Sequence, residues 1–319
     1  MLLGKKKSTI YRELLECGGP SFAVVGSLPI HALLAQKAGA DCFVISCIDT
    51  ALYLLGLPDA RLVTMSEVVE NAQRVCDAVS LPVIVDCGTG FGDGVNVRRT
   101  VEAVIRAGAA GLFIEDQVAP KRCGFVKGKE ILPLDEALGK YRAAIDARDE
   151  LDPDVIIMAR TDADGNLEES IRRGKAYKEA GVAGVWLEGL GSREEVRQAR
   201  AVIGTPLFLS ADSLSPPLSD EEMKELGVLD LGIDVNRVGM IGVWDLLASI
   251  KERGLDAWDE FIKLSQNHPL GGFGEFDLLG FPKVREWEER YLSPDHMKKY
   301  ETSLGLYEPG RGSRVKDTQ

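Results

Sequence analysis

Acidic and basic side chains follow two neighbouring apolar segments of the chain. The apolar run at 82–86 ends on Asp86, and the run at 111–116 carries Glu115 near its end. A charged loop with the sequence KRCG follows at 121–124. Ligands of parallel α/β proteins bind at the carboxyl ends of the strands, so we expect these groups to meet at one edge of a sheet. Acids that only cap the following helices would leave the nearby cysteine and cations unexplained.

The ends of the other apolar runs add polar side chains to the same predicted edge. Mg²⁺ prefers oxygen ligands, keeps several waters and takes only one or two carboxylates directly. We therefore assign Asp86 as the direct metal ligand and Glu115 as a ligand that acts through water. Arg160 either contacts a carboxylate substrate or pairs with another carboxylate at this edge of the sheet, which we call the rim, and it can do both. The predicted strand-end residues are Ser46, Asp86, Glu115, Arg160 with Asp162, Glu188, Asp212 and Asn236.

Cys123 is the cysteine that the sequence singles out for chemistry. Lys121 and Arg122 precede it, and positive neighbours lower the pKa of a thiol, so we expect an acid, a base or a nucleophile. The other five cysteines are scattered along the chain without a CxxC pair. This spacing is typical of a reduced protein rather than a disulfide framework, and it predicts a cytoplasmic location.

Short apolar runs alternate with helix-like stretches from residue 21 to residue 252. About eight such units with nearly continuous apolar strands predict an α/β fold of the (β/α)8 TIM-barrel class. An open, doubly wound sheet is the alternative, but the one Gly-rich turn, at 88–92, lacks the spacing of standard phosphate-binding loops. Capping boxes at 64–67 and 219–222 mark two helix starts. The expected strands are 21–26, 41–46, 82–86, 111–116, 154–161, 184–189, 206–212 and 231–238, and the expected helices are 29–38, 65–79, 96–107, 134–149, 167–180, 193–202, 220–226 and 239–252.

Charge and hydropathy exclude several classes of protein. The 319 residues carry a net charge of -12, and an acidic protein is a poor partner for nucleic acid or an anionic membrane. No apolar run reaches the ~20 residues of a transmembrane helix. The lysine-containing N-terminus lacks the apolar segment of a signal peptide. We expect a barrel at 1–254, a C-terminal helical extension at 255–304 that makes an oligomer contact, and a mobile tail at 305–319.

Several motifs of this sequence resemble the isocitrate lyase/phosphoenolpyruvate mutase superfamily, and within it the 2-methylisocitrate lyase-like enzymes. They are DxGTGFG at 86–92, GLFIEDQ followed by KRCG at 111–124, and IMARTDA at 157–163. The segment GLPDARLVTMSEVVENAQRV at 56–75 is similar to the gating loop and following helix of these enzymes. The resemblance extends over roughly residues 23–292.

The resemblance implies a barrel whose eighth helix is swapped between subunits of a homo-oligomer, usually a tetramer. It also implies Mg²⁺, with Mn²⁺ as a possible replacement, and small 2-oxo or 2-hydroxy carboxylate substrates that react through an enolate. Position by position, it implies roles in the metal shell for Asp86, Glu115 and Asp59. It implies a proton-donor role for Cys123 and roles near the oxoacid for Arg160 and Glu188. The implied substrate contacts are Ser46, Cys47, Ile48, Asp49, Lys121, Arg122, Gly124 and Asp212.

The departures from the family pattern cluster at the expected site. Gly88 stands where the family has a second aspartate, so one carboxylate of the metal shell is missing. Cys47 and Ile48 replace a glycine pair whose backbone amides usually hold the substrate carboxylate, and Phe125 replaces a histidine. Asp49 either restores part of the missing negative charge or caps a short helical turn at 50–55. The seventh strand also lacks the usual asparagine and ends in Ser-Ala-Asp at 210–212.

Two classes of function are compatible with this sequence. The favoured one is a Mg²⁺-dependent carbon–carbon lyase that cleaves a 2-hydroxy carboxylate or a methylisocitrate-like acid to a 2-oxoacid. An oxoacid hydrolase or decarboxylase on the same site is a variant of it, and the retained Cys123 favours the lyase. The second class is a diverged barrel with metal-independent chemistry or simple metabolite binding, and Gly88 and Ile48 favour it. Phe125 predicts a substrate that is less polar than methylisocitrate.

Overall fold

The computed structural model describes residues 4–19, 22–163, 165–204, 206–210, 214–310 and 312–313. The chain divides into two compact units, residues 1–237 and residues 238–319. The division falls near the start of the helix Asn236–Arg253. We predicted a domain boundary after residue 254, at the end of this helix, and that boundary stays a prediction. No helix in the described part of the chain is both long and apolar enough to cross a membrane.

Parallel strands of the first unit form one sheet in the order β8-β7-β6-β5-β4-β3-β2-β1-β9. The two end strands of this order are consecutive in the chain and are separated only by Leu231 and Gly232, so the sheet closes on itself. The predicted (β/α)8 barrel is therefore confirmed, and the open-sheet alternative is excluded. The strands are β1 Ala23–Gly26, β2 Cys42–Ile45, β3 Val83–Asp86, β4 Gly111–Glu115, β5 Ile156–Thr161, β6 Gly184–Leu187, β7 Leu207–Leu209, β8 Val228–Asp230 and β9 Ile233–Asp234.

The eighth strand of the barrel is broken, and the prediction of one strand at 231–238 is wrong at both ends. Its first half, β8, pairs with β7, and its second half, β9, pairs with β1. The break lies at Gly232, which has a φ of +124° and where a Cβ atom would come within 2.8 Å of the Ala23 backbone. Only glycine fits such a close approach, and the strand is interrupted at this residue. The following helix begins at Asn236, two residues before the end of the predicted strand.

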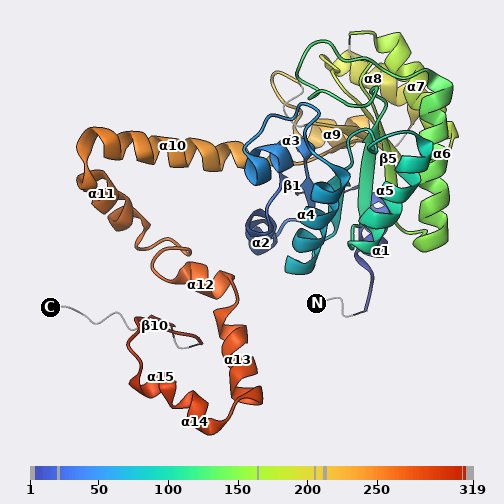
Figure 1. The fold of residues 1–319 in the computed structure, drawn as a ribbon. Helices are drawn as coiled ribbons and strands as arrows, with labels where there is room; N and C mark the ends of the chain where they lie inside the picture. Colours follow the sequence, from blue (N-terminus) through green and yellow to red (C-terminus); the bar gives the residue numbers. More distant parts are fainter. Residues whose placement is uncertain are drawn as a thin grey trace. The chain divides into compact units, whose positions relative to one another are not determined.

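Helices surround the strands of the first unit (Figure 1). The capping boxes predicted at 64–67 and 219–222 are both present and start α4 and α9. One helix, α1, has no counterpart among the predicted stretches, and its Tyr11 is buried in a core cluster with strand residues. The helices of this unit are α1 Lys7–Glu16, α2 Pro29–Ala38, α3 Cys47–Thr50, the π-helix η1 Ala51–Leu55, α4 Met65–Ala78, α5 Gly94–Arg106, α6 Leu134–Leu151, α7 Leu167–Glu179, α8 Arg193–Ile203 and α9 Asp220–Leu226.

The strands are buried on both faces, as expected for a parallel barrel. Along β2, Cys42 and Val44 belong to one core cluster, whereas Phe43 and Ile45 belong to another. This alternation follows from the two-residue period of a strand, which sends successive side chains to opposite faces. The apolar framework thus fixes the strand directions, and the polar residues just beyond the strands share one rim.

The second unit is helical and exposes many apolar side chains. In this single chain, Trp244 of α10 is 71% exposed, and Val238, Ile241 and Leu247 of the same helix are exposed too. Phe273, Phe276, Phe281 and Tyr307 form a small aromatic cluster. The elements are α10 Asn236–Arg253, α11 Leu255–Ser265, α12 Gly274–Leu278, α13 Phe281–Tyr291, α14 Pro294–Met297, α15 Lys299–Thr302 and the strand pair β10 Tyr307–Glu308 with β11 Gly312–Ser313.

Candidate active site

The end of β3 is joined to the segment after β2 through the carboxylate of Asp86. Oδ2 accepts a hydrogen bond from the Cys47 backbone N–H at 3.1 Å, and Oδ1 accepts one from the Gly88 N–H at 2.8 Å. Each oxygen keeps a free lone pair, because a carboxylate has about four acceptor positions. Asp86 is therefore held in a fixed orientation and can still bind a cation. The Cys47 amide lies where the resemblance implies a backbone donor for the substrate carboxylate, and here it donates to Asp86 instead.

Glu115 is a buried carboxylate without a hydrogen-bond partner among the described residues. It ends β4, it is 1% exposed, and neither of its side-chain oxygens has a donor. Lys121 Nζ and Arg160 Nε each lie 3.8 Å from one of its oxygens. Burial raises the pKa of Glu115 above its ordinary value, although these two cations oppose the shift. Buried polar groups are normally satisfied, so the two bare oxygens indicate a missing water or ion partner.

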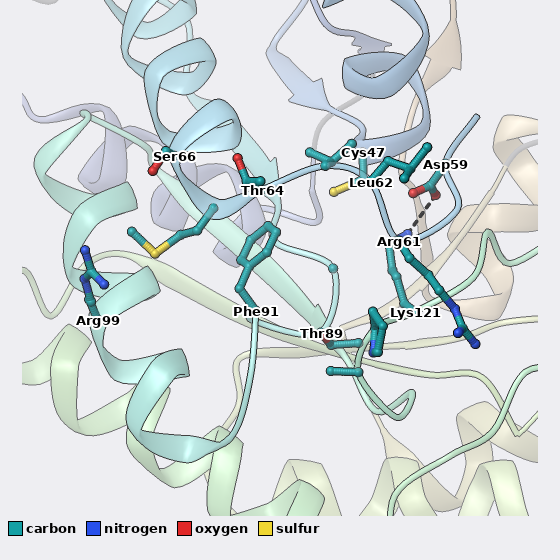
Figure 2. A pocket seen from close by; sticks show the side chains of 15 residues that line it. Cys47, Asp59, Arg61, Leu62, Thr64, Ser66, Thr89, Phe91, Arg99 and Lys121 are labelled. Carbon is teal, nitrogen blue, oxygen red and sulfur yellow. Dashed lines mark hydrogen bonds and ion pairs between the residues drawn. The ribbon is translucent and has the colours of Figure 1, made fainter. Parts of the chain in front are cut away.

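Lys121 connects the loop after β4 to the loop after η1. Its Nζ donates to Asp59 Oδ2 at 2.8 Å (Figure 2). Burial alone would lower the pKa of Lys121, but Glu115, Asp86 and other facing acids outweigh it, so the net shift is upward. The lysine is therefore a permanent cation at the rim.

Gly88 makes room for the Lys121 side chain. A Cβ atom at Gly88 would lie 3.2 Å from Lys121 Cε and 4.0 Å from Cys47 Sγ. Gly88 also has a φ of +50°, which L-residues rarely adopt. The space left by the missing aspartate is thus partly taken by a lysine stem and a thiol.

Arg160, at the end of β5, is the centre of an ion-pair network. It donates through Nε and Nη2 to Asp162 Oδ2 and Oδ1 at 3.0 and 2.8 Å, and Nη2 also lies 3.4 Å from Glu188. Its guanidinium packs over the Trp186 ring at 4.2 Å, a cation–π contact. Both predicted roles are compatible with this geometry, because the bidentate pair with Asp162 fixes the guanidinium beside Glu115.

Cys123 lies at the rim, where its backbone N–H donates to the Asp59 carbonyl at 3.1 Å. Burial raises the pKa of this thiol, and the nearby Lys121 and Arg160 only partly oppose the shift. The expectation that positive neighbours lower its pKa is therefore wrong, because desolvation is the larger effect. A thiol that stays protonated at neutral pH suits a proton donor rather than a nucleophile.

Lys129 is a residue of this site that the sequence analysis missed. Its Nζ donates to the Gly124 carbonyl at 2.7 Å and lies 3.3 Å from Asp162 Oδ1. Gly124 in turn touches the arginine, since a Cβ there would come within 2.2 Å of Arg160 Nη2. The lysine therefore anchors the cysteine loop onto the arginine network. In the sequence it belongs to a charged, glycine-rich run that is typical of solvent-exposed loops, and no local signal distinguishes it.

A second network of buried side chains lies behind Asp162, and the sequence analysis did not predict it. Asp116 accepts from Tyr177 Oη at 2.6 Å and from Arg173 Nη1 at 3.1 Å. The other Asp116 oxygen accepts from the Asp162 backbone N–H at 3.0 Å. This chain of hydrogen bonds positions Asp162, which positions Arg160, in the manner of outer-shell groups that orient binding residues.

Asp49 lies inside α3, so the prediction that it caps a turn at 50–55 is wrong. It is 3% exposed, and its Oδ2 has no hydrogen-bond partner among the described residues. Burial raises the pKa of Asp49 to about 7, and Asp234 adds to this, while the Ser46 and Asn236 side chains oppose it. The alternative role, charge compensation for Gly88, is not tested by these contacts and stays a prediction.

The remaining predicted site residues differ in their surroundings. The Arg122 side chain points to the Lys127 carbonyl rather than to the acids, and Ile48 is partly exposed. Phe125 is 77% exposed in the loop after Gly124. Asp212 lies outside the described residues. Ser46 precedes α3 and accepts from Thr50 through its carbonyl.

The acids suit an ion that keeps most of its waters. No group of three or more His, Cys, Asp or Glu side chains in the described ranges is arranged to enclose a metal directly. Mg²⁺ does not need such a group, because one direct carboxylate and water-mediated contacts to others are typical of it. Asp86 with free lone pairs and Glu115 with two bare oxygens fit this pattern.

A pocket of ≈ 540 Å³ opens beside these residues (Figure 2). Cys47, Asp59, Gly88 and Lys121 form part of its wall. The rest of the wall comes from the segment at 61–66, the Gly-rich turn after β3, helix α5 and the turn before Lys121. The Asp59–Lys121 ion pair of the rim therefore faces a space large enough for a small carboxylic acid.

Comparisons with known proteins agree with this geometry. The sequence family described as phosphoenolpyruvate phosphomutase matches residues 29–233. The 2,3-dimethylmalate lyase of Eubacterium barkeri is 36% identical over 293 residues, which span 88% of this chain and 97% of that enzyme. A crystal structure of 2,3-dimethylmalate lyase matches with a TM-score of 0.80 at 27% identity and covers 95% of this chain and 99% of that chain. Phosphonopyruvate hydrolase in complex with oxalate and Mg²⁺ matches with a TM-score of 0.78 at 27% identity, over 91% of this chain and 100% of that chain.

Proposed function

This chain belongs to the phosphoenolpyruvate mutase/isocitrate lyase superfamily, as its motifs predicted, and from that premise we propose that it is a Mg²⁺-dependent carbon–carbon lyase. It is an enzyme, and relatives are named lyases. The proposed reaction cleaves a 2-hydroxy carboxylate or a methylisocitrate-like acid to a 2-oxoacid through an enolate. The observation that carries this proposal is the bare, buried Glu115 carboxylate beside the fixed Asp86 and Arg160.

Asp86 would hold the metal directly, and Glu115 would contact it through water. Mg²⁺ held there would supply positive charge that stabilises the negative charge developing on the oxygen atoms of the substrate. The protein's own cations act at the same place, because Lys121 Nζ lies 3.8 Å from Glu115 and carries a permanent charge. Arg160 is oriented by Asp162 and would hold the carboxylate of the oxoacid fragment. Mn²⁺ would serve as a replacement, since it also takes oxygen ligands.

When the carbon–carbon bond breaks, its electron pair would leave with the departing fragment as an enolate, and the hydroxyl proton of the substrate would pass to a carboxylate of the rim. Cys123 would then give its proton to the enolate carbon of the departing fragment. The raised pKa keeps the thiol protonated before the reaction, and its loop is held over Arg160 by Lys129. A hydrolase or decarboxylase on the same oxoacid site is the second candidate, and the matched phosphonopyruvate hydrolase favours it. The cysteine at the rim favours the lyase, because a hydrolase delivers water and does not need a thiol there.

The apolar helices of the second unit support a proposed homo-oligomer, and the family resemblance implies a tetramer. Exposed apolar side chains of α10 form a surface that a monomer would leave in water. We also place the enzyme in the cytoplasm, since its cysteines are free.

Titration with Mg²⁺ tests the metal proposal. Isothermal calorimetry in the presence of pyruvate should give Mg²⁺ binding to the wild type and none to Asp86→Ala. Asp77→Asn, an exposed acid on α4, is the matched control and should bind as the wild type does. Equal Mg²⁺ affinity in Asp86→Ala and wild type would remove Asp86 as the ligand.

A further inference from the structure

Four buried side-chain oxygens without a hydrogen-bond partner belong to residues around the carboxyl end of β1. These residues are at most 3% exposed, and no donor within the described ranges reaches the four atoms. The atoms are Ser27 Oγ, Asp49 Oδ2, Asn71 Oδ1 and Asn236 Oδ1. Buried polar atoms are normally satisfied by protein, water or an ion, so such a group requires an occupant.

The barrel brings these four residues together from separate elements. β1 lies between β2 and β9, and the register of β1 and β9 places Asn236, two residues beyond β9, level with Ser27. Asn71 of α4 donates through Nδ2 to the Ser27 carbonyl at 2.8 Å. Asp49 lies in α3 directly after β2, and the Asn236 side chain is within hydrogen-bonding reach of its carboxyl. The four oxygens therefore surround one strand end.

The charge around these oxygens is negative and unbalanced. Asp49 forms no ion pair within the described ranges, and the charged groups that act most on its carboxyl are the acids Asp234 and Asp86. His31 of α2 lies near Asp234, but burial lowers its pKa, so it supplies no positive charge at neutral pH. A buried carboxylate without a compensating charge is costly. Water would satisfy the hydrogen bonds but leave the charge, whereas a cation satisfies both.

We propose that the carboxyl end of β1 holds a monovalent cation, Na⁺ or K⁺, bound by the side-chain oxygens of Ser27, Asp49, Asn71 and Asn236. We call this group of four residues the β1 site. Hard cations take oxygen ligands, and sites for divalent ions are tuned by the number of charged ligands. One buried carboxylate with amide and hydroxyl oxygens matches a single positive charge. The β1 site uses none of the residues assigned to Mg²⁺ and does not depend on the lyase proposal.

A cation in the β1 site would tie together elements that also shape the rim. Asp49 belongs to α3, whose Cys47 N–H donates to Asp86 at 3.1 Å. Tyr53 of η1 donates to the Asn236 carbonyl at 2.6 Å, so the segment between α3 and α4 is joined to the same place. The bound cation would let Asp49 ionise without the penalty of burial. Binding should therefore stabilise the folded chain.

Unfolding of the full chain in different chloride salts tests the β1 site at pH 8, with ionic strength and Mg²⁺ held constant. An ion that binds only the folded state multiplies the folded-to-unfolded ratio about tenfold for each tenfold rise in its concentration above the dissociation constant. The wild type should show this rise with K⁺ or Na⁺, and the ion that acts at lower concentration is the preferred one. Tetramethylammonium, which is too large for a cage of four oxygens, should have no effect.

Variants of the β1 site locate the effect. Asp49→Asn keeps the shape of the side chain but removes its charge, and it should shift the rise to at least ~10-fold higher concentration. In tetramethylammonium chloride the same variant should be more stable than the wild type, and the preferred cation should narrow that difference. Asp77→Asn, an exposed acid on α4, is the matched control and should respond as the wild type does.

Three results would overturn the assignment. Equal stability of the wild type in all three chlorides would mean that water fills the β1 site. An equal cation effect in Asp49→Asn and the wild type would place the ion elsewhere, and an effect of Ca²⁺ that neither Na⁺ nor K⁺ reproduces would make the site divalent. Crystals of the wild type soaked in Tl⁺, a heavy K⁺ analogue, give a test that needs no variant: an anomalous peak among the four oxygens is expected, and its absence contradicts the proposal.

Discussion

Replacing Asp49 by asparagine should stabilise this protein, and the gain should depend on pH. The carboxyl is 3% exposed, and its pKa is raised from 3.8 to about 7, chiefly by burial. A group whose pKa is raised by folding contributes stability below its unfolded pKa and loses that contribution as pH rises through the folded value. Between pH 4 and pH 7 the unfolded carboxyl is ionised while the folded one is still mostly protonated, so the cost of Asp49 to folding grows with pH and is complete above pH 7. Asparagine mimics the neutral carboxyl without this penalty.

The size of the effect follows from the shift. Each pKa unit corresponds to about 1.4 kcal/mol, so a shift of roughly three units gives at most about 4 kcal/mol above pH 7. The gain should fall to about 3 kcal/mol at pH 6 and below about 1 kcal/mol at pH 4, where the unfolded carboxyl is itself half protonated. Urea unfolding followed by circular dichroism at these pH values measures the difference directly.

Asp77→Asn provides the matched control, because this exposed acid on α4 should leave the free energy of unfolding within about 0.5 kcal/mol of wild type at every pH. A variant Asp49→Asn that is no more stable than wild type at pH 8 would refute the reasoning. It would mean that Asp49 is ionised at little cost, and the idea that it compensates for the carboxylate missing at Gly88 would gain support.

Two further predictions concern turnover and assembly. Cys123→Ser should reduce turnover by at least ~10²-fold, which is the usual scale of general acid–base catalysis, without a change in the free energy of unfolding. The control Cys17→Ser, at an exposed cysteine, should keep full activity. If Cys123→Ser fails to fold, Cys123 is structural. Light scattering should give an oligomer for the wild type and a smaller species for the double variant Ile241→Glu/Trp244→Glu. Both side chains are exposed apolar groups of α10 that an oligomer contact would bury. A monomeric wild type would contradict the proposed assembly.

The barrel was predictable because its signals are local. Strands that are buried on both faces appear as continuous apolar runs, and a residue that ends such a run must lie at the common rim. Asp86, Glu115 and Arg160 could be grouped for this reason alone. The break at Gly232 was not predictable, because it depends on how closely that residue approaches Ala23 in the closed sheet.

The electrostatic state of the site was harder to predict than its composition. Cys123 has cations beside it in the sequence, yet burial outweighs them and raises the pKa of its thiol. Lys129 and the Asp116 network act across sequence separations of 33 to 61 residues, so no local pattern reveals them. Desolvation and long-range contacts are properties of the folded chain. A sequence motif shows only which residues belong to the site.

The departures from the family pattern form one connected change rather than several independent ones. Gly88 stands where the resemblance implies a second aspartate, and the Lys121 stem and the Cys47 thiol lie against this position. The same Cys47 gives its backbone N–H to Asp86, and the same Lys121 pairs with Asp59. A new carboxyl at Gly88 would meet Lys121 Cε at 3.2 Å from its Cβ and would need a strained φ of +50°. Lys121 and an acidic side chain at position 88 would therefore compete for the same space, so the glycine and the position of the lysine stem depend on each other.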